Sequence, residues 1–271
     1  MRNSGVRSEC ITMRPHDHIG LVFDDLEGFD AIAVPFLAAG AARGEQLMYI
    51  APDPGPEVTS KLATLAPGGA RMVSTAEAYG SSGVIDPPAV LAFFTAIFLD
   101  ALNGGYTGLR VAADNTPLVT EEAALTPWYQ WEIIADRFVS ENSASALCAF
   151  NGSKIDVNRL RHLATMHPLS SAGGPQPRYR LFAEQGALRV EGQINSYAIS
   201  QIPMALEVLP AGTAVLINLS TSRLTESALS GLRDLRDAGI TVTIHGAPED
   251  LDALAAADLT PGEHLIIQPL G

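Results

Sequence analysis

Short apolar runs alternate with longer segments of helical periodicity along the first part of the chain, and this alternation constrains the fold more than any other feature. Such runs are too short to span a membrane and are typical of buried strands, so the pattern predicts a mainly parallel sheet with helices on both faces. The predicted strands are 19–23, 46–51, 71–74, 109–113 and 144–150, and the predicted helices are 26–43, 57–65, 87–103, 121–140 and 156–166.

The alternation stops at 171–177, where glycine and proline interrupt the pattern, and it resumes afterwards. We therefore expect a mobile arm over 1–15, an α/β domain over 16–170, a linker over 171–177 and a smaller α/β domain over 178–271. In the smaller domain the predicted strands are 179–182, 187–193, 214–219, 240–245 and 264–268, and the predicted helices are 199–208, 226–238 and 249–257.

Composition and charge narrow the classes of function. The 271 residues are 47% hydrophobic and 17% charged, which is typical of a compact folded protein. The net charge is −13 and lysine and arginine form no cluster, so we expect neither a nucleic-acid partner nor an anionic membrane surface. With no apolar run of about 20 residues and no secretory leader pattern, we expect a cytoplasmic protein. Cys10 and Cys148 show no metal-ligand spacing, so we expect two free thiols.

Four stretches of the first domain carry a resemblance to a known family. In chain order they are HDHIGLVF at 16–23, the segment from Pro35-Phe36-Leu37 through Arg43-Gly44-Glu45, GYTGLRV at 105–111, and ALCAFNGSKIDVNRLRHLATMHPL at 146–169. Together they resemble the MEDS domain, a sensory module related to the RecA/KaiC ATPase fold. The resemblance implies a RecA/KaiC-like sheet and the sensing of small, largely apolar hydrocarbon derivatives, in a family fused to signalling outputs. It implies no reaction.

The sequence argues against nucleotide hydrolysis. A phosphate-binding loop needs glycines, a lysine and a hydroxyl residue, whereas the first predicted strand is followed by Asp24-Asp25-Leu26-Glu27-Gly28, which carries three carboxylates and no lysine. Asp114, after the strand at 109–113, could mimic a magnesium-holding aspartate, but a turn residue explains it more simply. We expect no enzyme activity.

Four residues of the first domain are candidates for ligand binding: His18, Asp114, Cys148 and His167. They lie at the predicted strands or at the end of the last predicted helix. In open α/β sheets ligands bind beside the C-terminal ends of the strands, so we expect the pocket there.

Metal binding and nucleophilic catalysis are the alternative roles for the histidine and cysteine side chains of this domain. His16 and His18 lie on one side of an extended segment and could share a metal, but the sequence names no third ligand, so we expect no metal and no cofactor. A nucleophile pair between Cys148 and either His162 or His167 stays open, although a buried strand cysteine more often packs as a small hydrophobe.

The second domain carries its own resemblance over 178–257. The apolar run 214–219 leads into a helix, with Thr225 as a suitable N-cap and Glu226 in the first turn. This arrangement resembles the STAS domain of anti-sigma-factor antagonists, whose Asp-Ser-Ser-Gly-Leu motif is phosphorylated on the second serine. Here the motif reads Thr225-Glu226-Ser227-Ala228-Leu229. The resemblance implies that Ser227 is a phosphoacceptor candidate and that Thr225, Glu226 and Ser227 bind an anti-sigma factor or serine-kinase-like partner.

The two resemblances together predict a signalling regulator, in which a MEDS-like sensor controls a STAS-like output that acts as an anti-sigma-factor antagonist. Two alternatives remain. The STAS-like domain could dock its partner permanently, without a phosphorylation switch, because the aspartate and glycine of the motif are missing. A RecA-like fold could instead turn over a nucleotide.

Overall fold

The computed structural model describes residues 2–65 and 68–269, so residue 1 of the predicted arm and residues 270–271 of the predicted C-terminal domain lie outside the described residues. The chain is a mixed α/β protein. Its contacts divide it into two compact units, with the division between Gln176 and Pro177. Each unit is described by itself.

The first unit is built on a parallel sheet, as the alternation of the sequence predicts. In the described part of this unit the sheet has seven strands in the order β1-β7-β2-β6-β5-β3-β4. Each pair of neighbouring strands is parallel. The strands are β1 Gly5–Arg7, β2 His18–Phe23, β3 Gln46–Ala51, β4 Arg71–Ser74, β5 Leu109–Asp114, β6 Ala144–Asn151 and β7 Leu169–Ser171.

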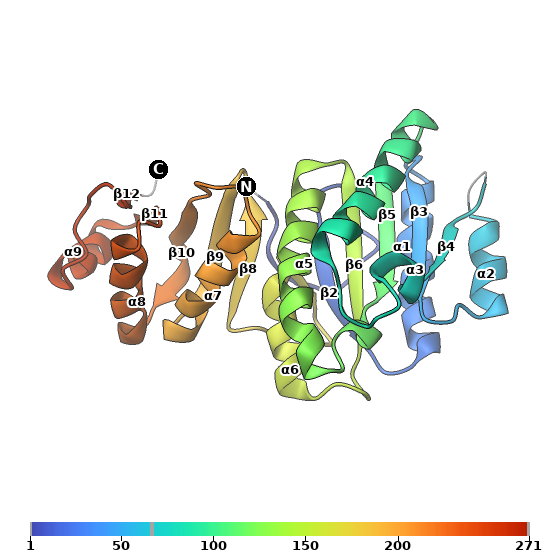
Figure 1. Ribbon diagram of the computed structural model, residues 1–271, viewed down its shortest axis with the longest axis horizontal. Coiled ribbons are helices and arrows are strands. Elements are labelled where there is room, and N and C mark those ends of the chain that lie inside the picture. The colour runs from blue at the N-terminus through green and yellow to red at the C-terminus, as the bar shows by residue number, and fades with distance from the viewer. Residues whose placement is uncertain (1, 66–67, 270–271) are drawn as a thin grey trace. The chain divides into compact units, whose positions relative to one another are not determined.

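Helices flank this sheet. Right-handed crossovers put α1 and α2 on one face and α3, α4, α5 and α6 on the other, and Figure 1 shows α4 and α5 in front of the strands. The helices are α1 Leu26–Ala41, α2 Pro56–Ala63, α3 Thr75–Tyr79, α4 Pro87–Asn103, α5 Glu122–Glu141 and α6 Val157–Leu163, with short 3₁₀ turns η1 Thr116–Leu118 and η2 Ala164–Met166. Across 2–65 and 68–269, none of the helices has the length and apolar character that a bilayer crossing requires.

The alternation of side chains along the central strands separates two environments. Ile19 on β2 and Leu147 on β6 belong to the apolar core with Phe36 of α1. Because successive strand residues point to opposite faces, His18 and Cys148 face the other side, toward α5. The register of β2 and β6 therefore decides which polar groups meet beneath α5.

A buried ion pair joins two of the stretches that resemble the MEDS domain. Arg110 of β5 is fully buried, and its Nε donates to Glu45 Oε2 at 2.5 Å. Its guanidinium also lies 4.6 Å from the ring of Phe36. Gly40 makes room for it, since a Cβ there would stand 2.5 Å from Arg110 Cδ. The segment ending at Glu45 and the stretch 105–111 thus meet in one structural contact.

Part of the predicted mobile arm over 1–15 joins the first sheet. Gly5–Arg7 forms β1 and pairs with β7, with Gly5 opposite Leu169. Met13 is buried, and its carbonyl accepts hydrogen bonds from both Arg43 and Arg110. A strand of three residues is too short to produce a period in the sequence, which is why the pattern did not predict β1 or its neighbour β7.

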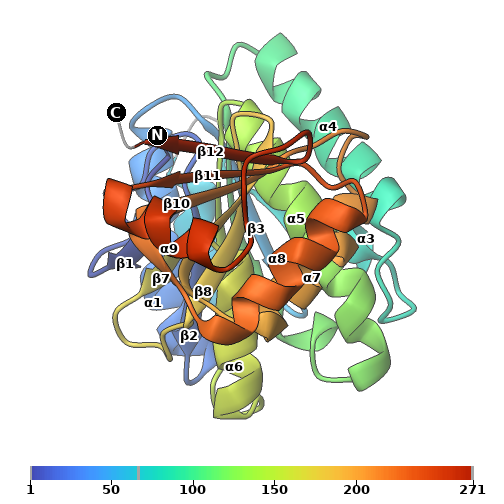
Figure 2. The same ribbon diagram turned by 90° about the vertical axis from the view of Figure 1, so that its left-hand side faces the viewer.

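The second unit has a smaller sheet. In its described residues five strands lie in the order β12-β11-β10-β9-β8, with β8 and β9 antiparallel and the other pairs parallel. The strands are β8 Tyr179–Glu184, β9 Ala187–Ile194, β10 Val215–Leu224, β11 Val242–Gly246 and β12 Leu265–Pro269, and the helices are α7 Ser196–Glu207, α8 Glu226–Asp237 and α9 Pro248–Ala256. Helices α7 and α8 pack side by side (Figure 2).

Strand β10 differs from its prediction at one end. The sequence predicted a strand over 214–219 and then a turn, whereas β10 continues to Leu224. The pairing with β9 shifts between Ile217 and Ser222, so the intervening residues form a bulge. The side chain of Asn218 accepts from the backbone N–H of Ser220 at 2.9 Å inside this bulge. The polar residues that indicated a turn therefore belong to an interrupted strand.

Candidate functional site

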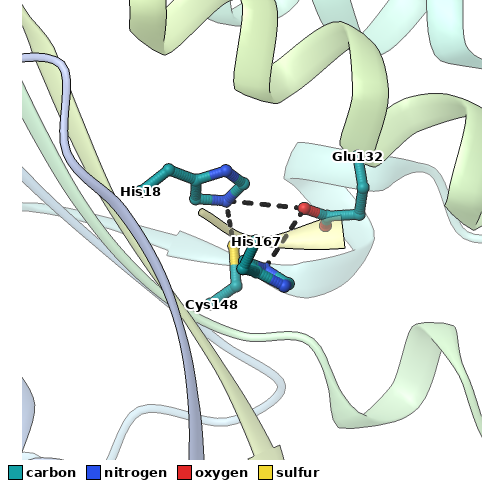
Figure 3. Close-up of side chains that lie close together, drawn as sticks. All are labelled: His18, Glu132, Cys148 and His167. Carbon is teal, nitrogen blue, oxygen red and sulfur yellow. Dashed lines mark hydrogen bonds and ion pairs between the residues drawn. The ribbon is translucent and has the colours of Figure 1, made fainter. Parts of the chain in front are cut away.

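Four ionisable side chains from distant parts of the chain meet under α5. They are His18 of β2, Glu132 of α5, Cys148 of β6 and His167, which lies between η2 and β7. All four are buried, and one potential ligand atom from each lies within 4.8 Å of the others. We call these residues the His–Cys–Glu cluster; Figure 3 shows them converging, with dashed lines joining His18 to Glu132 and Cys148 and joining His167 to Glu132.

Each member is positioned by local structure. The parallel register of β2 and β6 places His18 and Cys148 on the same face, with Gly20 opposite Cys148. The ring of His167 packs over Gly20, where a Cβ would stand 3.0 Å from His167 Nδ1. The two imidazole rings have their centroids 4.5 Å apart. Glycine at position 20 is therefore what allows His167 to approach the sheet.

Hydrogen bonds on the outer side of the cluster fix both imidazoles. His18 Nδ1 lies 3.0 Å from Asp136 Oδ1, and His167 Nδ1 lies 3.1 Å from the carbonyl oxygen of Leu163. Both oxygens are acceptors, so each Nδ1 carries the proton and donates. In the neutral rings the lone pair then belongs to Nε2, and both Nε2 atoms point into the cluster, toward Glu132 Oε2 at 3.5 and 3.4 Å.

Asp136 is ionised in this environment. Burial raises the pKa of its carboxyl group, but the charge of Arg2 and the hydrogen bond from His18 outweigh this and lower the pKa to about 2. The Arg2 guanidinium donates to Asp136 Oδ2 at 2.7 Å. The N-terminal segment thus supplies the cation that balances a buried carboxylate next to the cluster.

Burial favours the protonated forms of Glu132 and Cys148, in contrast to Asp136. Burial, followed by the neighbouring charge of Asp136, raises the pKa of Glu132 well above its usual value. Burial likewise raises the pKa of the Cys148 thiol, and the charge of Glu132 adds to the effect. Both groups therefore hold their protons unless a cation compensates for the loss. The Cys148 Sγ lies 3.3 Å from His18 Nε2.

An apolar cavity adjoins the cluster. It encloses about 40 Å³, and His18 and Cys148 form part of its wall. The rest of the wall is almost entirely apolar and comes from α3, α4, α5, β5 and β6: Tyr79, Phe94, Leu109, Val111, Ala113, Trp131, Ala135, Phe138, Val139, Ala144, Ser145, Ala146 and Leu147. A single water needs roughly 10–15 Å³ by a comparable measure, so this cavity has room for a molecule of a few heavy atoms.

Three of the four residues predicted to bind a ligand come together here: His18, Cys148 and His167. Asp114 does not join them. It lies at the end of β5, where its carboxylate accepts from the backbone N–H of Thr116 at 2.9 Å as a turn residue does. The cavity also differs from the expected location, because it extends along the strands, from Leu109 to Ala113 of β5 and from Ala144 to Cys148 of β6, and is not confined to their C-terminal ends.

The sequence reasoning missed Glu132 and Asp136. Both lie on the buried face of α5 and are fully buried. They are four residues apart, which places them on one side of a helix. The sequence did indicate them, because two carboxylates on the apolar face of a predicted helix would be buried. A buried carboxylate requires a partner, so each of them points to a polar contact in the core.

The other histidines considered from the sequence lie outside the cluster. His16 Nδ1 lies 3.3 Å from the carbonyl oxygen of Val139, and the His162 ring meets Tyr129 edge to face. Cys148 contacts His18, which was not one of the two partners weighed for a nucleophile pair. A buried thiol with a raised pKa is a poor nucleophile, because the thiolate is the reactive form.

The predicted phosphoacceptor region lies at the start of α8. Ser227 and Glu226 are exposed, and Thr225 is the N-cap residue. The Thr225 side chain makes no capping hydrogen bond to the helix but lies 3.0 Å from Ser227 Oγ. Ser227 Oγ also accepts from the backbone N–H of Ser196, at the start of α7, at 3.3 Å. Beside this helix, a hollow of about 940 Å³ is lined by residues of β9, β10, α8 and α9.

The fold and the buried cluster define a parallel α/β domain with a buried polar site, followed by a second α/β unit. The chain belongs to the MEDS family, whose model, the methanogen/methylotroph DcmR sensory domain, matches residues 17–168. This match contains every member of the His–Cys–Glu cluster. A comparison with characterised proteins found no match for the chain.

Proposed function

We propose that this protein is a signalling regulator in which the MEDS domain binds a small ligand and the C-terminal unit, as a STAS-like output, binds a protein partner as an anti-sigma-factor antagonist does. The observation that carries the proposal is the family match over 17–168, followed by a separate compact unit from Pro177. A RecA/KaiC relationship for the first unit fits its parallel sheet. A cytoplasmic location fits two free, buried thiols.

The cavity next to the His–Cys–Glu cluster supports a small and largely apolar ligand. Most of its wall offers burial without hydrogen-bonding groups, and His18 and Cys148 add polar groups on the side of the cluster. Ala146→Val would reduce the space without adding a polar atom. We expect small halogenated or oxygenated hydrocarbons to raise the melting temperature of the wild type and to lose this effect in the variant. Equal shifts in both proteins would place the ligand elsewhere.

The start of α8 supports a partner surface that responds to charge. Ser227 is exposed, and phosphorylation would add about −1.5 to −2 charges to this surface. A partner that packs against Thr225, Glu226 and Ser227 would then meet desolvation and repulsion. We propose an anti-sigma factor or serine-kinase-like protein as this partner, and no nucleic acid or membrane.

A pull-down from native lysate, with mass spectrometry of the partner and of Ser227, identifies the partner. Its affinity is then compared for the wild type, Ser227→Ala and Ser227→Asp. We expect Ser227→Ala to bind as the wild type does and Ser227→Asp to bind at least tenfold more weakly. Ser230→Asp is the matched control, because Ser230 is an exposed serine of the same helix. Equal loss in both aspartate variants would indicate a general charge effect and no switch at Ser227.

A permanent docking module is the second candidate. Glu226 is exposed beside Ser227 and already places a negative charge in the first turn of α8, which opposes phosphorylation of its neighbour. Equal binding by Ser227→Ala and Ser227→Asp, with Ser227 never modified, would favour this function over the switch.

We propose binding and not catalysis for the first unit. The helix that follows β2 begins after Asp25, whose side chain accepts from the backbone N–H of Gly28 at 2.8 Å. A carboxylate therefore occupies the helix N-terminus at which a nucleotide phosphate would bind. We expect no turnover of ATP with magnesium by the purified protein, and steady release of phosphate above the rate of a buffer control would contradict this.

A further inference from the structure

We propose that the His–Cys–Glu cluster is a binding site for one divalent transition metal ion of the zinc class, with His18, His167, Cys148 and Glu132 as its ligands. The sequence reasoning expected no metal here. The inference concerns the site itself and does not depend on which ligand the domain senses or which partner it binds.

The hydrogen-bond arrangement prepares both imidazoles for a metal. Histidine ligands usually donate their other ring N–H to a carboxylate or a backbone carbonyl, which fixes the tautomer and the orientation of the ring. His18 does so with Asp136 and His167 with Leu163. Asp136 is itself held by Arg2. Two separate supports therefore leave two Nε2 lone pairs directed at one point.

Three of the distances between the donor atoms fit a tetrahedral site. Zinc bonds of about 2.0–2.3 Å place neighbouring ligand atoms roughly 3.3–3.7 Å apart. His18 Nε2 lies 3.3 Å from Cys148 Sγ and 3.5 Å from Glu132 Oε2, and His167 Nε2 lies 3.4 Å from the same oxygen. With all four donor atoms within 4.8 Å of one another, small side-chain movements suffice to bring them around one ion.

Charge balance favours a cation at this position. A thiolate at Cys148 and a carboxylate at Glu132 carry two negative charges, which a divalent ion neutralises, while Arg2 neutralises Asp136. Glu132 Oε2 is buried and receives no hydrogen bond, although Asn115 lies 3.4 Å from the other oxygen. A buried carboxylate oxygen without a donor is costly unless a proton or a cation compensates for it.

The donor set selects the class of metal. Two imidazoles and a thiolate are soft or borderline ligands that suit zinc, cobalt or iron, whereas magnesium and calcium prefer oxygen. The competing arrangement contains no metal: the Cys148 thiol donates to His18, and a protonated Glu132 donates to His167. The two arrangements differ in whether the thiol is ionised, and this difference can be measured.

The experiment uses the full chain, stripped with a chelator and then titrated with cobalt(II). We expect one ion per chain, an intense visible spectrum typical of tetrahedral cobalt and a near-ultraviolet thiolate-to-cobalt charge-transfer band. Zinc should displace the cobalt with the same stoichiometry by elemental analysis. A folded wild-type chain that binds no stoichiometric ion, or that binds cobalt without the thiolate band, would overturn the proposal in favour of the metal-free arrangement.

Matched variants locate the site. Cys148→Ser should remove the charge-transfer band and weaken zinc binding at least tenfold, whereas Cys10→Ser, at the other buried cysteine, should change neither. His167→Gln should weaken binding similarly, with His162→Gln as its control. Asp136→Asn, which weakens the support of His18 and the ion pair with Arg2 without removing a ligand atom, should weaken binding about 10–100-fold. Circular dichroism establishes that each variant is folded, and unchanged affinity in folded Cys148→Ser and His167→Gln would contradict the assignment.

Discussion

Gly20 controls how closely His167 approaches β2. A Cβ at this position would stand 3.0 Å from Nδ1 and 3.1 Å from Cγ of the ring, and the ring is fully buried with its Nδ1 hydrogen-bonded to Leu163. Gly20→Ala should therefore displace His167 and lower the free energy of unfolding by about 1–3 kcal/mol, the usual cost of overpacking. Chemical denaturation measures the loss, and the zinc affinity should fall with it.

The control for this prediction is Gly173→Ala, because a Cβ at Gly173 meets no atom within 4 Å. That substitution should leave both the stability and the metal affinity close to those of the wild type. If Gly20→Ala matched it in both measurements, the close contact with His167 would have no energetic importance.

Arg110 and Glu45 form a second test at the scale of single residues. Both are buried, so removing Arg110 leaves Glu45 with only the longer contact to Arg43, at 3.9 Å. Arg110→Met should lower the free energy of unfolding by about 3–5 kcal/mol. Glu57→Gln removes one partner of the exposed Glu57–Lys61 pair and should give no measurable change. Equal denaturation midpoints for Arg110→Met and the wild type would show that the buried pair is dispensable.

At the residue scale, the sequence identified the histidines and cysteine of the site but not its carboxylates. His18, Cys148 and His167 were predictable because each lies within a stretch that resembles the MEDS domain. His18 and Cys148 lie on predicted strands or next to them, and His167 follows the end of a predicted helix. Glu132 was not predictable, because its role depends on which face of α5 covers the sheet. The sequence also could not show that Asp114 lies apart from these three residues. Strand alternation reveals which residues share a face only after the register of neighbouring strands is known.

At the scale of elements, the strength of the periodic signal decided what could be predicted. The bounds of β3, β4 and α4 agree with the predicted 46–51, 71–74 and 87–103. Short apolar runs mark the two strands, and a proline at the start and glycines after the end mark the helix. The three-residue strands β1 and β7 carry no such signal. The end of β10 was misplaced because polar residues in a bulge resemble a turn.

The start of α8 gives a prediction about an element. Ser227→Ala removes the acceptor for the Ser196 N–H and should lower the free energy of unfolding by about 0.5–1 kcal/mol. Ser227→Asp keeps an acceptor and adds a negative charge at the helix N-terminus, which contributes about 0.3–1 kcal/mol in the opposite direction. Denaturation should therefore rank the aspartate variant above the alanine variant.

This ranking separates stability from partner binding. If Ser227→Asp binds the partner more weakly although it is the more stable of the two, the loss comes from the binding surface and not from unfolding of α8. A less stable aspartate variant would instead show that the charge of Glu226, next to Ser227, dominates the first turn.

At the scale of the whole molecule, the division between Gln176 and Pro177 separates the proposed metal site from the proposed partner surface. Every member of the His–Cys–Glu cluster precedes this division, and Ser227 follows it. The composition of 171–177 indicated the linker region, although β7 extends the first sheet to Ser171. The side chain of Gln176 also accepts from Ser170 Oγ at 2.7 Å, which ties the end of this segment to the first unit.

Thermal unfolding of the full chain should therefore show two transitions, one for each unit, and zinc should raise only one of them. An ion at 100 times its dissociation constant stabilises the unit that binds it by about 2.7 kcal/mol. For a unit of this size that corresponds to a rise of roughly 5–10 °C in Tm. Because every ligand lies before Gln176, the transition that moves must belong to the first unit, and Cys148→Ser should abolish the shift without changing the other transition.

Limited proteolysis between 172 and 178 should yield two folded fragments, of which only the N-terminal one binds cobalt. A single cooperative transition, or a zinc shift of both transitions by the same amount, would contradict independent units.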